Sequence, residues 1–348
     1  LAGGDYFTNF NQNPELGEIP EEVRQLVPEN IHLVYWDYFS RDRQSYERNI
    51  DAHNAIKSGS WFAGGLWTWA GFAPHNTFSI ATMREAMKAC HAKGVENVVM
   101  TMWGDNGAEC SKFAVLPALF MVAQMARGID DEETIHANFE KEFGIPFEDF
   151  RALDLAGTQN DSAEAIYNPE KYLLYCDPFM GQFDNRVKPA DAAGYADCAA
   201  RLAVYADHAE YGYLFRSLRA LCAFLSVKAD LGIRTRAAYL SGDKKAAKAL
   251  CTDYDAALER LDAFYTAYEQ QWMHENKPQG FDVVDLRIGG QRQRLLHCRD
   301  RLLAYAEGRL DRIEELEEPV LDCCCEEKAD GQATRAIFWH EIASANVI

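Results

Sequence analysis

The sequence predicts an α/β segment that is followed by an all-α segment. In the first third of the chain, short apolar runs rich in β-branched and aromatic residues alternate with amphipathic stretches, the pattern of parallel strands joined by helices. From Ile129 onward, strand-like runs largely vanish and long helical periodicities replace them. Hydrophobic residues make up 48% of the 348 residues, which suits a protein that buries a core.

The first two strand–helix units are predicted between residues 31 and 94. A short helix at 20–26 precedes them. Strands are expected at 31–38 and 61–68, and the helices that follow them at 40–57 and 79–93. Ser79 is expected to cap the second of these helices and Gly94 to end it, because hydroxyl side chains suit helix starts and glycine suits helix ends.

A third unit pairs a strand at 97–103 with an apolar helix at 116–127. The crossovers between strands are long enough for the right-handed connection of parallel strands. Three such units match three of the eight in a TIM barrel, which needs about 250 residues. We therefore expect residues 1–128 to form a portion of a (β/α)8 barrel.

Residues 129–348 are predicted to form a mostly α-helical domain. The breaks at 241–243 and 276–280 separate long amphipathic patterns, so the helices should pack antiparallel through short connections. The helical patterns are expected at 132–142, 190–209, 211–239, 244–272 and 290–315.

Charge and cysteine usage exclude several functional classes. The formal charge of −19 argues against nucleic acid and against an anionic membrane surface, because phosphate binding relies on Lys and Arg. No apolar run is long enough to span a bilayer. The ten cysteines contain no two matching C-x-x-C pairs, so we expect reduced thiols in a cytoplasmic protein, including the adjacent Cys323, Cys324 and Cys325.

The richest candidate site follows the third predicted strand. Trp103 and Asp105 share one strand face with Thr101, so an aromatic plate and a carboxylate stand at the carboxyl end, where parallel barrels place their chemistry. A sugar suits this pair, since its C–H face stacks on indole and its hydroxyls donate to a carboxylate. The alternative is a core tryptophan and a helix-capping aspartate. Asn106 lies in the same turn, and Glu109 either contacts the ligand or orients Asp105.

Aromatic residues also gather at the other two strand ends. Tyr35 and Asp37 share one face of the first strand, and Trp36 and Tyr38 share the other. We favour Tyr35 and Asp37 toward the barrel interior; alternatively, Tyr35 only packs and a bulge presents Trp36.

In the second strand, Trp67 and Trp69 lie on one face beside Gly64 and Gly65, and two such indoles would wall a pocket. Glycine in a strand permits close approach of another element. The chain has no glycine-rich phosphate loop, no HExxH and no Ser-His-Asp signature.

Three strand-end motifs together resemble a known family. VYWDY (34–38), FAGGLWTWAGFAP (62–74) and MTMWGDNGAECSKFAVLP (100–117) resemble the last third of the barrel in glycoside hydrolase family 20. NKPQGFDVVDLRIGGQRQR (276–294) resembles a segment of the helical C-terminal domain found in bacterial exo-β-N-acetylhexosaminidases of that family. The resemblance implies that this chain is the C-terminal part of such an enzyme.

The resemblance implies removal of terminal β-linked GlcNAc or GalNAc with retention, in which the acetamide oxygen of the substrate attacks the anomeric carbon. An Asp-Glu pair assists: the Glu protonates the leaving oxygen and the Asp orients the acetamide. Trp103 would then form the floor of the acetamide pocket, and Trp36, Trp67 or Trp69 its walls. Asp105, where most members have Glu, would bind outer hydroxyls, and Tyr35 would bond to the acetamide. No metal or organic cofactor is implied.

One departure from the family pattern concerns the catalytic pair. The Asp-Glu pair and the first five strands are expected upstream of residue 1, since Asp131-Glu132 follows one helix and starts another. The chain would then bind an amino-sugar glycoside without supplying a proton donor. Its partners would be the missing N-terminal portion or a second copy in a homo-oligomer.

Two other functions stay open at this point. One is a non-catalytic carbohydrate-binding or interaction protein on the same scaffold. The other is a hydrolase of another barrel family with Asp37 and Asp105 as its acids, which requires carboxylates roughly 5–10 Å apart.

Overall fold

The computed structural model describes residues 20–105, 107–158 and 168–320, which form two compact units. The first unit comprises 20–67, His75–Trp103 and Val115–Phe147. The second comprises Thr68–Pro74, Gly104–Ala114 and the described residues from Glu148 onward. Two loops that follow strands in the sequence thus belong to the second unit. We call them the 68–74 loop and the 104–114 loop.

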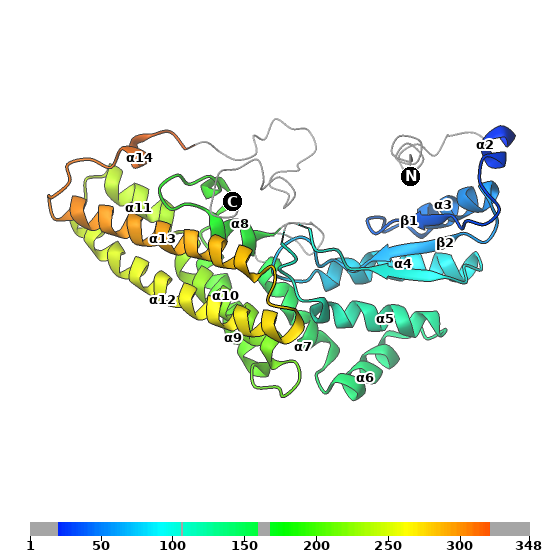
Figure 1. Ribbon diagram of the computed structural model, residues 1–348. Coiled ribbons are helices and arrows are strands. Elements are labelled where there is room, and N and C mark those ends of the chain that lie inside the picture. Colours follow the sequence, from blue (N-terminus) through cyan, green and yellow to red (C-terminus); the bar gives the residue numbers. More distant parts are fainter. Residues whose placement is uncertain (1–19, 106, 159–167, 321–348) are drawn as a thin grey trace. The chain divides into compact units, whose positions relative to one another are not determined.

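The first unit is built on a parallel sheet of three strands in the order β1-β2-β3 (Figure 1). This confirms the predicted parallel βα units, although each strand is shorter than its apolar run. Its strands are β1 (Val34–Trp36), β2 (Trp61–Gly65) and β3 (Val98–Thr101). Its helices are α2 (Glu21–Gln25), α3 (Arg43–Ile56), α4 (Asn76–Ala92), α5 (Leu116–Ala126) and α6 (Glu132–Phe143).

The helix α6 packs with α5 through edge-to-face contact between Phe139 and Phe120, whose ring centroids are 5.5 Å apart. The first unit therefore runs on to Phe147, and the predicted domain boundary after residue 128 stays a prediction.

The face of the sheet under α3 and α4 is the apolar core of the first unit. Phe62 of β2 is paired in register with Tyr35 of β1, and both rings contact Tyr46 of α3. Gly64, two residues on, lies on the same face. A Cβ atom there would collide with the sulfur of Met83 in α4 and lie 2.6 Å from the Cε atom of Met100. The glycine therefore lets α4 and β2 approach closely.

The prediction that Tyr35 turns toward the barrel interior is wrong. Its buried ring lies against Tyr46 and His53 of α3, with centroids 6.2 and 5.1 Å away. Because strand side chains alternate, this places Trp36 on the open face, as the alternative interpretation had it. Asp37 follows the end of β1, so strand alternation does not fix its direction.

The helix α4 begins earlier than predicted. It starts at Asn76, and Ser79 lies inside it. The Ser79 hydroxyl accepts from the Trp67 amide (2.9 Å) and donates to the His75 carbonyl (2.8 Å). The serine therefore ties the segment after β2 to the start of α4, instead of capping the helix. Gly94, at a φ of +65°, follows the helix end as predicted.

The second unit is helical, as predicted, and α10, α12 and α13 are its long elements (Figure 1). The helix α10 packs on α9 and α12, and α12 packs on α13. The α-helices are α7 (Phe147–Arg151), α8 (Pro169–Tyr175), α9 (Asp191–Leu202), α10 (Gly212–Lys228), α11 (Leu231–Leu240), α12 (Lys244–Glu275), α13 (Phe281–Ala306) and α14 (Glu314–Glu317). Short 3-10 helices are η1 (Lys112–Val115), η2 (Ala152–Gly157), η3 (Asp184–Arg186) and η4 (Ala203–Tyr205).

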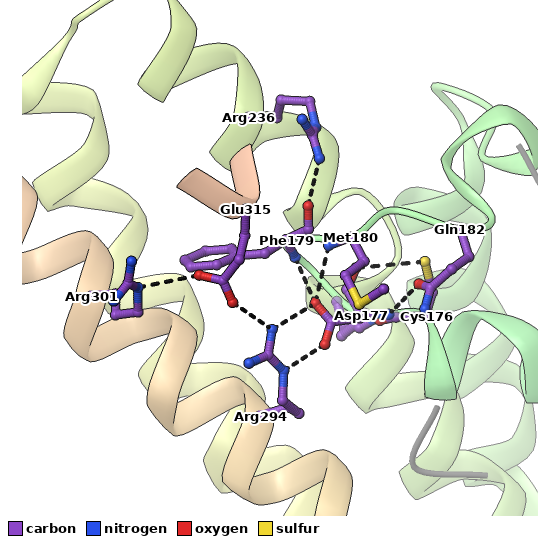
Figure 2. A network of polar contacts seen from close by, with 10 residues as sticks. Cys176, Asp177, Phe179, Met180, Gln182, Arg236, Arg294, Arg301 and Glu315 are labelled. Carbon is purple, nitrogen blue, oxygen red and sulfur yellow. Dashed lines mark hydrogen bonds and ion pairs between the residues drawn. The ribbon is translucent and has the colours of Figure 1, made fainter. Parts of the chain in front are cut away.

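A polar network joins the segment after α8 to α13 (Figure 2). The Asp177 carboxylate accepts from the amides of Phe179 (2.9 Å) and Met180 (3.1 Å) and from the Arg294 guanidinium (2.5 Å). Burial alone would raise the pKa of Asp177, but the Arg294 guanidinium and the two amides hold it below its ordinary value. Arg294 also pairs with Glu315 at 3.6 Å, which fixes the segment around α14.

In the described ranges, no helix combines the length and the apolar character that a bilayer crossing requires.

The glycine at position 64 gives a test of the close approach between β2 and α4. Gly64→Ala should destabilise the protein by about 1–3 kcal/mol in urea unfolding, because the added methyl overlaps Met83 and Met100. Gly289→Ala is the control, since this helical site in α13 has open space, and it should be neutral or stabilising by up to about 1 kcal/mol. Equal stability of the two variants would contradict the packing described.

Candidate functional site

Two exposed indoles stack on the open face of the sheet. The rings of Trp36 and Trp103 have centroids 5.3 Å apart and planes 26° apart, yet they stay 50% and 39% exposed. Trp36 ends β1, and Trp103 lies two residues beyond β3. Next to Trp36, β2 presents the small residues Ala63 and Gly65 on this face, two and four residues after Trp61, so the two side chains can reach across the middle strand. An exposed aromatic pair at the carboxyl ends of parallel strands is suited to stack on a sugar ring.

Buried groups behind β1 hold the segment that carries this indole pair. Trp67 is buried, packs edge-on against Phe78 at 5.1 Å, and donates from Nε1 to the Tyr38 carbonyl at 3.1 Å. The Asp37 carboxylate accepts from the Tyr35 hydroxyl (2.7 Å) and the Phe39 amide (2.8 Å). Trp67 and Asp37 thus shape the turn after Trp36.

The structure does not bring Trp67 and Trp69 together as a same-face pair. Trp67 is the last residue of the segment 20–67, which belongs to the first unit. Trp69 is buried in the 68–74 loop, which belongs to the second unit. The strand β2 ends at Gly65, so the period-2 argument that put both indoles on one face does not reach them.

In the second unit, the helix α8 holds the 68–74 loop. The Asn168 side-chain amide donates to the Ala70 carbonyl at 2.9 Å. One oxygen of Glu170 accepts from the amides of Phe72 (3.0 Å) and Ala73 (3.2 Å). Burial raises the pKa of this carboxyl to about 7, although these amide bonds and the charge of Lys171 oppose the rise.

The next residue of α8 holds the 104–114 loop. The Lys171 ammonium lies 2.5 Å from one oxygen of Glu109, and the Arg287 guanidinium of α13 lies 3.2 Å from the other. Glu109 is 4% exposed and Lys171 is 1% exposed. The Tyr268 hydroxyl donates to the Glu109 carbonyl at 2.9 Å. Buried charges need such partners, so this geometry favours Glu109 as an anchor of the loop over a contact to ligand.

The turn before Glu109 presents Asp105 to solvent. It is closed by a bond from the Ala108 amide to the Gly104 carbonyl at 3.1 Å. Gly107 has a φ of +123°, and Ala108 has a φ of +51°, which is unusual for a residue with a side chain. Asn106 lies outside the described residues. The exposed Asp105 therefore lies in a turn that is closed by this bond and that holds Ala108 in an unusual backbone conformation.

Lys112 is a residue near this turn that sequence reasoning missed. Its half-buried ammonium donates to the Thr68 hydroxyl at 2.9 Å and thereby joins the two loops. Burial lowers the pKa of Lys112, while the charges of Asp105 and nearby acids oppose that shift. Only its position three residues after an acid in a polar turn could have indicated it.

The Asp131-Glu132 pair is a helix start, as the sequence predicted. The Asp131 carboxylate accepts from the amide (2.8 Å) and hydroxyl (2.6 Å) of Thr134, and these bonds lower its pKa. A general acid needs the opposite shift. No group of three or more His, Cys, Asp or Glu suited to a metal ion occurs in the described part of the chain.

These observations define a class of protein: a parallel βα unit with exposed indoles at its strand ends, and a helical domain that anchors the strand-end loops. The family profile described as Glycoside Hydrolase 20C C-terminal domain matches residues 146–335. The chain therefore belongs to this glycoside hydrolase family, which confirms the resemblance found in its motifs. No curated protein matches the chain.

The buried Glu170 carboxyl predicts a pH dependence of stability. Because its folded pKa of about 7 exceeds the ordinary 4.5, its contribution is fully present below pH 4.5 and is lost as pH rises through 7. The free energy of unfolding should fall by roughly 3 kcal/mol across this window from this group alone. Glu170→Gln keeps the acceptor oxygen and should flatten that part of the profile in urea unfolding. Parallel profiles for both proteins would contradict the assignment.

Proposed function

We propose that this chain is part of a retaining exo-β-N-acetylhexosaminidase that removes terminal β-linked GlcNAc or GalNAc. The exposed stack of Trp36 and Trp103 carries the proposal, because it occurs at strand ends in a chain of this glycosidase family. An indole binds the apolar face of a pyranose, and a carboxylate accepts from its hydroxyls. Asp105 supplies such a carboxylate two residues after Trp103.

The proposed roles follow the family resemblance, adjusted to the geometry. Trp103 forms the floor of the acetamide pocket, Trp36 is one wall, and Trp69 is a second candidate wall. Asp105 and Asn106 bind the outer hydroxyls. Tyr35 donates to Asp37 and so supports the turn after Trp36, a role that its buried position favours over direct contact with the acetamide.

The proposed reaction needs a proton donor that these residues do not provide. In substrate-assisted catalysis, the acetamide oxygen attacks the anomeric carbon while a Glu protonates the leaving oxygen. Asp131 and Glu132 do not fit, since Asp131 caps α6. We infer that the donor lies on further strands that complete a TIM barrel. The exposed Val34 and Val99, on the open face beside the indoles, support this inference, because apolar sheet faces are normally covered.

A second candidate is a non-catalytic carbohydrate-binding or interaction protein on the same scaffold. The same indole pair supports it, and it requires no acid. A proposed cytoplasmic location suits both candidates, since the seven cysteines in the described ranges are all free thiols.

The two candidates share a prediction about the chain as given. Homogeneous protein should release 4-nitrophenol from 4-nitrophenyl N-acetyl-β-glucosaminide no faster than buffer. The reaction needs an Asp that orients the acetamide and a Glu that protonates the leaving oxygen, and the adjacent Asp-Glu pair among the described residues, Asp131-Glu132, starts the helix α6 instead. The measurement is the absorbance of released nitrophenol, with an active hexosaminidase as control. Robust turnover would overturn the inference that the acid lies elsewhere.

Binding of N-acetylglucosamine tests the indole pair directly. Trp103→Ala should raise the Kd of this sugar by about tenfold in isothermal titration, because an aromatic stacking contact contributes roughly 0.5–1.5 kcal/mol beyond the apolar area that it buries. Trp61→Phe is the control, since the Trp61 ring stacks on His32, with ring centroids 5.5 Å apart, and the substitution keeps an aromatic ring there. An unchanged Kd in the Trp103 variant would remove the support for both candidates.

A further inference from the structure

The anchor at Glu109 is formed by charged residues that the family motifs around the indoles do not include. Lys171 comes from α8 and Arg287 from α13, and they take one carboxylate oxygen each. Lys171 is only 1% exposed and the Arg287 side chain 12%, whereas such residues are almost never fully buried unless they are paired. Two cations therefore hold one residue of the 104–114 loop, Glu109, in place.

That fixed residue terminates the strained turn. Ala108, directly before Glu109, adopts a left-handed conformation, which persists only where the surroundings over-determine it. Arg287 also lies against the turn, since a Cβ atom on Gly107 would be 2.6 Å from its Nη1 atom. On the other side, a Cβ atom on Gly104 would lie 2.7 Å from that of Ala108. Without the anchor, we expect the turn to relax and Ala108 to leave its left-handed conformation.

We propose that Lys171 and Arg287 are positioning residues of the helical domain that, through Glu109, hold Asp105 in place for the sugar. The inference rests on the proposed function, because it takes Asp105 to bind substrate hydroxyls. It assigns to the helical domain a direct part in affinity.

Loss of either cation would weaken this anchor. Removing one cation leaves the Glu109 charge buried with half its partners, which is costly in a site shielded from water. The carboxylate would then seek solvent and carry the turn with it. Loss of a hydrogen bond between the Asp105 carboxylate and a sugar hydroxyl would cost on the order of 10- to 100-fold in affinity, since hydrogen bonds to charged groups are the stronger ones.

The test compares N-acetylglucosamine affinity in the full chain and its variants. Lys171→Met and Arg287→Met should each raise the Kd by up to about 10- to 100-fold in isothermal titration, the worth of the hydrogen bond from the sugar to Asp105. Arg287→Lys, which keeps a cation at a position with some solvent access, should recover part of the loss. Leu295→Ala is the matched control, because Leu295 is a buried core residue of the same helix α13. This substitution should lower the melting temperature without changing the Kd.

Hydrogen exchange of the 104–110 amides gives a second readout that needs no sugar. Exchange at Ala108, whose amide bonds to Gly104, should accelerate in Lys171→Met and Arg287→Met but not in Leu295→Ala. Unchanged exchange and unchanged Kd in the two cation variants would overturn the inference while leaving the proposed function intact. If the unmodified chain binds no sugar, the proposed function fails, and with it the claim that the anchor serves affinity, whatever the exchange data show.

Discussion

The burial of charge on α8 is the constraint on which the second unit depends. All seven residues of this short helix are buried, including Glu170 and Lys171. An ionised side chain removed from water needs partners of opposite charge or strong hydrogen-bonding groups. For Glu170 these are two amides of the 68–74 loop, and for Lys171 the partner is Glu109 of the 104–114 loop. Two consecutive residues thus bind two loops far away in the sequence.

The opposite end of α8 obeys the same constraint. Lys228 of α10 is buried, and its ammonium donates to the carbonyls of Leu173 (2.7 Å) and Cys176 (2.5 Å), which the end of the helix leaves free. Burial lowers the pKa of Lys228, although the charges of Cys176, Asp184 and Asp177 oppose that shift. Just beyond, Asp177 bonds with Arg294 of α13. The helix is therefore held at both ends by ionisable groups, and its position is fixed by chemistry as well as by packing.

Sequence periodicity predicted the βα units and the long helices because those features depend on local apolar spacing. It misjudged Tyr35, since alternation says which residues share a face but not which face the helices cover. Ser79 resembled a cap locally, whereas its partner at Trp67 is distant in sequence. The anchors at Glu170 and Lys171 were not predicted at all. Their charges suggest solvent exposure, and only the tertiary structure shows their partners.

This difference explains why the sequence revealed the motifs around the indoles but not the residues of the helical domain that anchor the loops. Trp103, the proposed ligand-binding aromatic residue, lies in a compact local pattern with Asp105. A positioning group needs only to arrive at the right point in space, so its sequence context carries little signal. Glu109 combines both cases. It lies inside the motif that the sequence showed, yet its carboxylate is bound by Lys171 and Arg287, which are distant in sequence. Acids within a binding motif therefore divide by burial. The exposed one remains available to ligand, and the buried one secures the turn.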